Sequence, residues 1–380
     1  MRKIVPALLL SIIATGALSC SNGNTKGNKT SHIGMSEETT NQYIENGIDK
    51  GVSGAFTGMI GSRLIMAGGC NFPENPLAPD SKKKFYKGIY LLGNLDSDSI
   101  ALKKIGSLPH EIAYGAAVPT NNGLVLIGGT DGNMVFADTY LLQVDSDART
   151  TLTRLPELPF TADNTAATAI DNVVYIAGGN VNGIPSNSFY SLDLSDAGKG
   201  WEKLPDFPGN PRTQPVMSSG IGAHGAKNIY LWGGFAPKTG EKEATLNTDG
   251  LKYDITRKEW SPLPAPLSPD GQEISLGGGA AAITPHGMTV AVGGVNKDIF
   301  LAALRNQPPD YLTHPPHWYK FNGCILLFNP ATESWSIMAQ TQETARAGAG
   351  IAVTPDNELI VVGGEIKPRI RTPHIGRLEL

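Results

Sequence analysis

The chain has 380 residues, with 31 Lys and Arg against 35 Asp and Glu and a formal net charge of −4. Apolar residues make up 40% of the chain and charged residues 17%, a composition that supports a sizeable core and excludes an intrinsically disordered protein. The 45 Gly and 27 Pro follow no Gly-X-Y period, which excludes collagen and favours many short strands joined by tight turns. The near-neutral charge argues against a nucleic-acid-binding protein.

The N-terminus has the pattern of an export signal. Met1-Arg2-Lys3 form a basic start, and the apolar stretch 4–18 is too short for an ordinary membrane span. Residues 1–19 are therefore predicted to be a signal peptide. Residues 17–20, Ala-Leu-Ser-Cys, resemble a bacterial lipobox in which Cys20 is lipidated, although Ala17 replaces the preferred Leu. Plain secretion is the alternative.

Residues 20–41 are rich in Ser, Asn, Thr, Gly and Lys, and this composition predicts a flexible tether. We therefore expect an exported protein, periplasmic or attached to the outer membrane by a lipid on Cys20. No later segment has 18 uncharged apolar residues, so no other contact with a membrane is expected.

A short apolar run that ends in Gly-Gly occurs six times in the chain. Each run is too short for a helix and rich in β-branched residues, so it predicts a buried strand. The paired glycines permit a backbone conformation that other residues rarely adopt. The runs with their glycines are residues 64–69, 124–129, 173–179, 229–234, 289–294 and 359–364.

Three further strands are expected around each run. A segment of small residues precedes it, as at 115–118 and 348–353, and suits an innermost strand. A strand such as 189–194 follows the glycines, and an outer strand with Trp before Pro follows that, as at 201–205. After the sixth Gly-Gly the chain has room for only one more strand, near 376–380. Residues 42–48 are therefore predicted to supply the missing outer strand.

Four strands per repeat of about 50 residues, with Gly-Gly and a late Trp, resemble the kelch repeat. The resemblance implies an all-β fold, a six-bladed kelch-type β-propeller over residues 42–380, whose last blade is closed by an N-terminal strand. Ring closure would leave only short, protected sheet edges. Because such propellers have many functions, function has to be argued from the site.

Polar residues recur in the loops that lead into or out of these strands. A propeller gathers such loops on one face near its axis, so their side chains are candidates for substrate binding. The candidates are Asn71, His110, Glu111, Asn164, Arg212, Asp270 and Arg346, together with the segment 365–372 after the sixth Gly-Gly. The alternative for Arg212 and Arg346 is a role in linking neighbouring blades. The alternative for Glu365 and Arg371 is a structural ion pair that ties the last blade.

Three motifs resemble the bacterial N-acetylneuraminate epimerases, the sialic acid mutarotases. Gly364-Glu365-Ile366-Lys367-Pro368 with Arg371-Thr372 matches the family's motif at its spacing. Residues 67–73 match a second motif except at Cys70, and residues 268–271, Ser-Pro-Asp-Gly, match a third. The Glu motif closes the chain here, whereas in the epimerases it precedes the Ser-Pro-Asp-Gly motif. That order resembles the branch described as cyclically permuted mutarotases.

The resemblance implies an isomerase that interconverts the α and β anomers of N-acetylneuraminate without a metal or organic cofactor. Glu365 is then the acid/base that moves protons during ring opening, and Arg371 the ligand of the sugar carboxylate and an electrostatic stabiliser. The expected partner is a small acidic sugar. The alternative is a non-catalytic propeller that binds glycan or protein at the cell surface. A copper radical oxidase is disfavoured, because no Tyr, Cys and His set stands out.

The remaining chemistry-bearing residues have simpler interpretations. Cys70 and Cys324 could pair, but two thiols are no disulfide framework, and small buried side chains are favoured. His314 and His317 are separated by two prolines and have no nearby Cys in the sequence, so they give little support to a metal site. The basic run 82–84 is interpreted as a solvated loop.

Overall fold

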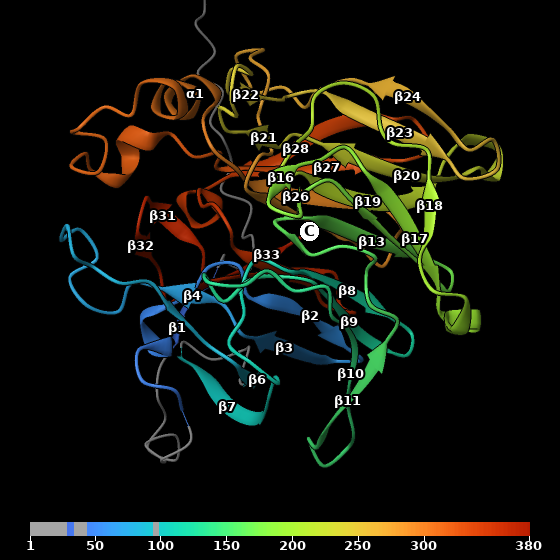
Figure 1. The fold of residues 1–380 in the computed structure, drawn as a ribbon, viewed down its shortest axis with the longest axis horizontal. Helices are drawn as coiled ribbons and strands as arrows, with labels where there is room; N and C mark the ends of the chain where they lie inside the picture. The colour runs from blue at the N-terminus through green and yellow to red at the C-terminus, as the bar shows by residue number, and fades with distance from the viewer. Residues whose placement is uncertain (1–28, 34–43, 94–98) are drawn as a thin grey trace, which may run out of the picture.

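The computed structural model describes residues 29–33, 44–93 and 99–380, which form an all-β fold of small antiparallel sheets (Figure 1). The longer strands form six groups of four, and an N-terminal strand joins the first and sixth groups into one eight-stranded sheet. The first three are β2 (Phe56–Ile60), β3 (Arg63–Ala67), β6 (Gly88–Gly93) and β7 (Ser99–Ser107); β8 (Ala116–Thr120), β9 (Gly123–Ile127), β10 (Thr139–Val144) and β11 (Thr150–Leu155); β13 (Ala166–Ile170), β14 (Val173–Ala177), β17 (Phe189–Asp193) and β18 (Glu202–Leu204). The next three are β19 (Val216–Ile221), β20 (Lys227–Trp232), β23 (Gly250–Asp254) and β24 (Glu259–Leu263); β25 (Gly279–Ile283), β26 (Thr289–Gly293), β27 (Cys324–Asn329) and β28 (Ser334–Gln340); β29 (Gly350–Val353), β30 (Glu358–Val362), β33 (His374–Glu379) and β1 (Lys29–Ile33).

Short elements occupy the connections between these strands. The short strands are β4 (Cys70–Asn71) with β5 (Lys84–Phe85); β12 (Ala162–Asp163) with β15 (Asn180–Val181) and β16 (Ile184–Pro185); β21 (Phe235–Ala236) with β22 (Thr245–Leu246); and β31 (Glu365–Lys367) with β32 (Ile370–Arg371). The helices are α1 (Lys297–Asn306) and the 3-10 turns η2 (Ile48–Lys50), η3 (Leu194–Lys199), η4 (Ala223–Gly225), η5 (Pro316–Tyr319) and η6 (Gln342–Thr344). Within the described ranges, no helix has the length and apolar character needed to cross a membrane.

The first strands of the six sheets contact one another in a cycle: β2 contacts β8, each later first strand contacts the next, and β29 contacts β2. A closed cycle of six backbone hydrogen bonds lies where the chain leads into these strands. All six residues have φ between +48° and +73°. The N–H of each donates to a carbonyl of a neighbouring sheet: Tyr114 to Gly54 (2.8 Å), Asn164 to Tyr114 (2.7 Å), Gln214 to Asn164 (2.8 Å), Gly278 to Gln214 (3.0 Å), Gly348 to Gly278 (2.7 Å) and Gly54 to Gly348 (2.9 Å).

The Gly-Gly pairs connect each sheet to the next one. In five of the six pairs the second glycine donates its N–H across the boundary, as Gly129 does to the carbonyl of Ala162 at 2.8 Å. The N–H of Gly364 donates to Val52 at 2.8 Å and so joins the sixth sheet to the first. A Cβ atom on Gly128, whose φ is +57°, would lie 2.4 Å from the carbonyl oxygen of Ala162. Glycine is therefore required both by the left-handed backbone and by the close approach of the next sheet.

Apolar side chains fill the spaces between neighbouring sheets. One cluster packs Leu64 and Met66 of β3 with Ile360 and Val362 of β30, so the first and sixth sheets share a core. Another cluster joins the second and third sheets in the same way. Each such aliphatic side chain contributes roughly 1.5–3 kcal/mol when it is fully buried. The core is thus distributed around the cycle of sheets, between their faces.

An N-terminal strand completes the sixth sheet, but it is not the predicted one. β1 pairs antiparallel with β33, from Lys29 opposite Arg377 to His32 opposite His374, and also pairs in parallel with β7. Lys29–Ile33 lies within the segment that the composition predicted to be a flexible tether. The prediction that residues 42–48 supply this strand is therefore wrong.

Residues 44–51 are held against the first sheet as turns and the 3-10 helix η2. The carboxylate of Glu45 accepts hydrogen bonds from the N–H of Gly88 at 2.6 Å and the hydroxyl of Tyr90 at 2.9 Å. Gly47 has φ +89°, a conformation that interrupts a strand. Gln42 and Tyr43 lie outside the described residues. Local turn chemistry thus overrides the weak strand pattern of this segment.

The longest interval between two Gly-Gly pairs holds an insertion that the repeat pattern did not predict. α1 begins after Asn296, whose side-chain oxygen accepts a hydrogen bond from the N–H of Ile299. Phe300 packs edge to face on Phe235, with ring centres 4.9 Å apart. The 3-10 turn η5 contacts β31. Figure 1 shows α1 and its connecting loop on the same side of the molecule as the β31–β32 hairpin.

Candidate active site

The β31–β32 hairpin places Glu365 directly opposite Arg371. It follows the sixth Gly-Gly at once, and Arg369 in its turn has φ +69°. The register brings the side chains of Glu365 and Arg371 onto one face. Their carboxylate and guanidinium groups form an ion pair, and the N–H of Arg369 donates to the same carboxylate at 3.2 Å. The two residues that the motif singled out therefore form one unit.

The guanidinium of Arg371 is engaged on every nitrogen. Nη1 faces Glu365, Nε donates to Oγ of Ser53 at 3.0 Å, and Nη2 donates to the hydroxyl of Tyr114 at 3.4 Å. Its central carbon lies 5.2 Å from the ring centre of Phe72. Only 4% of the side chain is exposed. Arg371 thus holds Glu365 in place and has little room for a further ligand.

Two opposing effects act on the ionisation of Glu365. Burial raises the pKa of its carboxyl above the ordinary value, whereas the Arg371 charge, the hydrogen bond from Arg369 and the Lys83 charge lower it. The raised pKa is the net result. A carboxyl tuned in this direction exchanges protons more readily near neutral pH than an exposed one does. Since 22% of the side chain remains exposed, the carboxylate is also accessible from the pocket.

Tyr114 connects the Glu365–Arg371 ion pair to the cycle of six backbone hydrogen bonds. Its backbone belongs to the cycle of six hydrogen bonds, with φ +61°, and its hydroxyl faces Arg371. Burial raises the pKa of Tyr114, so the phenol stays protonated across the physiological range. The Nζ of Lys83 lies 3.5 Å from the same hydroxyl.

A pocket of about 580 Å³ opens onto the Glu365 carboxylate. We call it the Glu365 pocket. One wall is formed by Phe72, Lys83, Tyr114 and the β31–β32 hairpin, and the other by α1 and the loop after it. On the latter wall, burial raises the pKa of Tyr311 to about 12, with Tyr319 and Glu365 adding to the shift. The insertion between β26 and β27 therefore covers the site.

Three of the predicted binding residues are buried and bonded to the protein. Asn71 donates to Gly47 and Gly51, both at 2.8 Å, and accepts from Tyr86. Arg212 and Arg346 are 1% and 3% exposed. Each donates to the first glycine of its own sheet's pair, Gly233 at 3.1 Å and Gly363 at 2.9 Å, and each pairs with a carboxylate. These side chains hold the fold, and their placement adds no support for contact with a substrate.

The other predicted loop residues lie outside the Glu365 pocket. His110 stacks on Phe136 with ring centres 3.8 Å apart, and its Nε2 lies 3.3 Å from Asp138. Glu111 is exposed beside a different, shallow pocket. Asn164 adjoins Tyr114 through the backbone cycle, but its amide groups bond to Asp163 at 2.9 Å and Gln214 at 2.7 Å.

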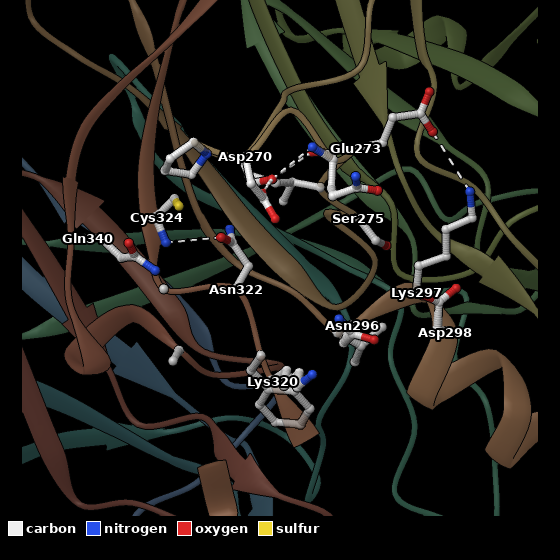
Figure 2. Close-up of a pocket in the computed structure, with 18 of the residues that line it drawn as sticks. Asp270, Glu273, Ser275, Asn296, Lys297, Asp298, Lys320, Asn322, Cys324 and Gln340 are labelled. Carbon is white, nitrogen blue, oxygen red and sulfur yellow. Dashed lines mark hydrogen bonds and ion pairs between the residues drawn. The ribbon is translucent and has the colours of Figure 1, made fainter. Parts of the chain in front are cut away.

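Asp270 lines a second and larger pocket of about 1110 Å³, which Figure 2 shows. The loop 268–275, the start of α1 and residues 320–324 form its walls. The hydroxyl of Ser268 donates to Asp270 and lowers the pKa of that carboxyl. Ile366 lines this pocket while Glu365 lines the other, as the alternation of side chains along a strand requires. The Ser-Pro-Asp-Gly motif therefore shares a cavity with Ile366 of the Glu motif but not with Glu365.

Sequence reasoning missed Tyr114, Lys83 and the α1 wall. Tyr114 occupies the same place before its inner strand as Asn164 does in the next repeat, so superposing the repeats would have found it. α1 had a signal in Asn296, which precedes apolar residues at helical spacing. For Lys83 the sequence carried no signal of a role in the site beyond the charge of its side chain.

The described residues contain no group of three or more His, Cys, Asp or Glu side chains placed to hold a metal ion. Cys70 and Cys324 are both buried and unpaired, as the sequence favoured. The Glu365 pocket itself is lined by a carboxyl group, guanidinium and ammonium groups and phenols.

A model of the N-acetylneuraminate epimerase family matches residues 155–380. Three similar curated proteins are named N-acetylneuraminate epimerase. The one from Yersinia enterocolitica is 30% identical and the match covers 58% of this chain and 56% of the relative, while the one from Haemophilus influenzae strain PittEE is 31% identical over 57% of each. The one from Yersinia pestis strain Pestoides F is 29% identical over 63% of this chain and 61% of the relative. The match thus spans less than two thirds of each relative's length. A solved structure described as "Structure of YjhT" is 27% identical with a TM-score of 0.49, covering 59% of this chain and 65% of that one.

Proposed function

Since the chain belongs to the N-acetylneuraminate epimerase family, we propose that it is a mutarotase that interconverts the α and β anomers of N-acetylneuraminate. The observation that carries the proposal is the Glu365 carboxyl, which burial tunes toward neutral pH and which opens onto a pocket beside three cations. The relatives' name supplies the substrate, an acidic sugar.

The reaction needs protons to move between two oxygens of the sugar. A base removes the proton from the anomeric hydroxyl, the bond from the anomeric carbon to the ring oxygen breaks, and the ring oxygen takes up a proton. Rotation of the resulting ketone and the reverse steps give the other anomer, so atoms and electrons balance without a redox partner. Glu365 accepts the first proton as carboxylate and returns it as carboxylic acid.

Arg371 serves this chemistry by holding Glu365. The ion pair orients the carboxylate, and the guanidinium charge opposes the burial effect on its pKa, so that the ionised base remains populated. The sequence-based role of Arg371 as ligand of the sugar carboxylate is weakened, because all its nitrogens already have partners in the protein.

We further propose that the fold is a closed six-bladed kelch-type propeller. The support is the cycle of contacts among β2, β8, β13, β19, β25 and β29, and the closed ring of six backbone hydrogen bonds beside it. A ring of near-equivalent sheets tolerates a change in where the chain begins, which fits the reversed order of the motifs. The domain then comprises β1 as well as residues 44–380.

Export and lipidation are proposed from the sequence alone, since residues 1–28, including Cys20, lie outside the described residues. The basic start and apolar stretch support a signal at 1–19, and the segment before Cys20 supports lipid attachment. Cys20→Ala is expected to move the protein from the membrane fraction to the soluble fraction. Recovery of the unaltered protein in the soluble fraction after export would contradict lipidation.

The Glu365→Gln variant tests the catalytic assignment. It keeps the shape and hydrogen-bonding reach of the side chain but removes the titrating carboxyl. Loss of general acid/base help typically costs about 10²–10⁴ in rate, so anomer exchange measured by saturation-transfer NMR should fall close to that of buffer. Calorimetric binding of N-acetylneuraminate should remain. Unchanged exchange would reject Glu365 as the base, and binding without exchange in the unaltered chain would favour a non-catalytic glycan-binding propeller.

A further inference from the structure

Lys83 lies in the Glu365 pocket among aromatic rings. Its Nζ is 5.1, 5.7 and 5.9 Å from the ring centres of Tyr114, Phe72 and Phe85. The ammonium also lies 3.5 Å from the Tyr114 hydroxyl. Ring faces attract a cation without occupying its N–H donors, so the ammonium, which donates one long hydrogen bond to Tyr114, is held in place with donors left for a ligand.

No ion pair joins Lys83 to any Asp or Glu within the described part of the chain. Its neighbour Lys84 differs, because the Nζ of Lys84 donates to the carbonyl of Asn46 at 2.6 Å and so holds the N-terminal segment. The sequence interpretation of 82–84 as a uniform solvated loop is therefore inaccurate. Although the Lys83 side chain is exposed, it is positioned at the wall of the pocket.

The pocket carries an excess of positive charge. Lys83, Arg369 and Arg371 face a single carboxylate, Glu365, and Arg371 pairs with it. Arg369 donates to the carbonyl of Ala78 at 3.1 Å and lies over Phe72. Two of the three cations thus have no carboxylate partner in the described chain, and Lys83 is the more accessible of the two.

We infer that Lys83 binds the carboxylate of the acidic sugar in the Glu365 pocket, an inference that rests on the proposed function. Arg371 is 4% exposed and each of its nitrogens faces a protein group, whereas the Lys83 ammonium is open to the pocket. A carboxylate at Lys83 leaves Glu365 free to face the anomeric hydroxyl. Lys83 therefore determines the specificity for an acidic over a neutral sugar.

The test compares N-acetylneuraminate with its methyl ester, which lacks the charge. In Lys83→Gln, we expect the KM for N-acetylneuraminate to rise about 10- to 100-fold, as for loss of a hydrogen bond to a charged group, with a smaller change in kcat. The KM for the ester should be equal in both proteins. Lys83→Arg should restore the KM for the acid, and Lys82→Gln, a matched neighbour outside the pocket, should behave as the unaltered chain does.

The inference would be overturned by a KM for the acid that stays at its original value in Lys83→Gln, or by an equal loss for acid and ester. If the unaltered chain showed no exchange, the proposed reaction would fail alone. Calorimetric binding of the acid and the ester to the same variants would then decide the role of Lys83, and equal affinity of the unaltered chain for both would reject it.

Discussion

Glu365 is set by its immediate neighbours, which come from four separate parts of the chain. Two of them, Arg371 and Arg369, lie on its own hairpin, and Lys83 and Phe72 lie on the loops around β4 and β5. Tyr114 belongs to the cycle of backbone hydrogen bonds. Tyr311 and Tyr319 lie on the insertion between β26 and β27. The charges among them lower its pKa, while the burial that they provide raises it. The balance makes the site sensitive to pH.

Activity should depend on pH through the raised pKa of Glu365. The base form is the carboxylate, so kcat/KM falls as pH decreases through this pKa, and the acid limb should lie above the ordinary value of 4.5. Because the Lys83 charge lowers this pKa, Lys83→Gln should move the limb to higher pH. Exchange rates measured by NMR between pH 4 and 8 check both shifts. A limb at or below 4.5 in the unaltered chain would rule out burial as the dominant effect.

At this scale the sequence identified the reacting pair but not its surroundings. Glu365 and Arg371 are six residues apart, and a hairpin is enough to bring them together. Lys83 and Tyr114 reach them only through the packing of the sheets, so Lys83 has no marking pattern and Tyr114 is marked only by its place in the repeat. Arg212 and Arg346 were predicted to bind substrate, since an arginine in a loop suits either role until its burial is known.

At the level of elements, the Gly-Gly pairs determine how closely neighbouring sheets approach. Gly128→Ala would place a Cβ 2.4 Å from the carbonyl of Ala162, in addition to the left-handed φ of +57°. We expect it to lower the free energy of unfolding by about 3 kcal/mol or more. Gly183→Ala is the matched control, with φ +81° and open space around the new Cβ, and should cost about 1–2 kcal/mol. Equal losses in urea denaturation would contradict the role in sheet-to-sheet contact.

The strands were predictable and the helix was not. Six short apolar runs with a fixed Gly-Gly ending mark the second strand of each sheet, and the structure confirms all six as almost continuously buried strands. α1 interrupts the fifth repeat, and the expectation of four strands per repeat hid its signal. That insertion supplies the wall formed by Phe300 and Tyr311, so the covering of the site was also missed.

At the scale of the whole molecule, the sixth sheet is completed by an N-terminal segment, β1, that pairs with β33. Removal of residues 1–28 leaves β1, whereas removal of 1–43 also deletes Lys29–Ile33 and exposes the edge of β33. We expect the longer truncation to melt at a clearly lower temperature. Scanning calorimetry of both proteins, produced without the export signal, measures this. Equal melting temperatures would show that β1 adds nothing to the stability of the sixth sheet.

The repeat count predicted that the chain's ends meet, because the sixth repeat lacks one strand. The identity of that strand was not predictable from composition. The polar segment 29–33 lacks the apolar alternation of an ordinary strand, and backbone pairing with β33 supplies its order.

Saturation-transfer NMR on a mixture of α and β N-acetylneuraminate measures whether the intact chain catalyses anomer exchange. We expect the exchange rate to rise in proportion to the concentration of the chain while the final ratio of anomers stays that of buffer, because a catalyst lowers only the barrier. An exchange rate that equals the buffer rate at every concentration would contradict this expectation.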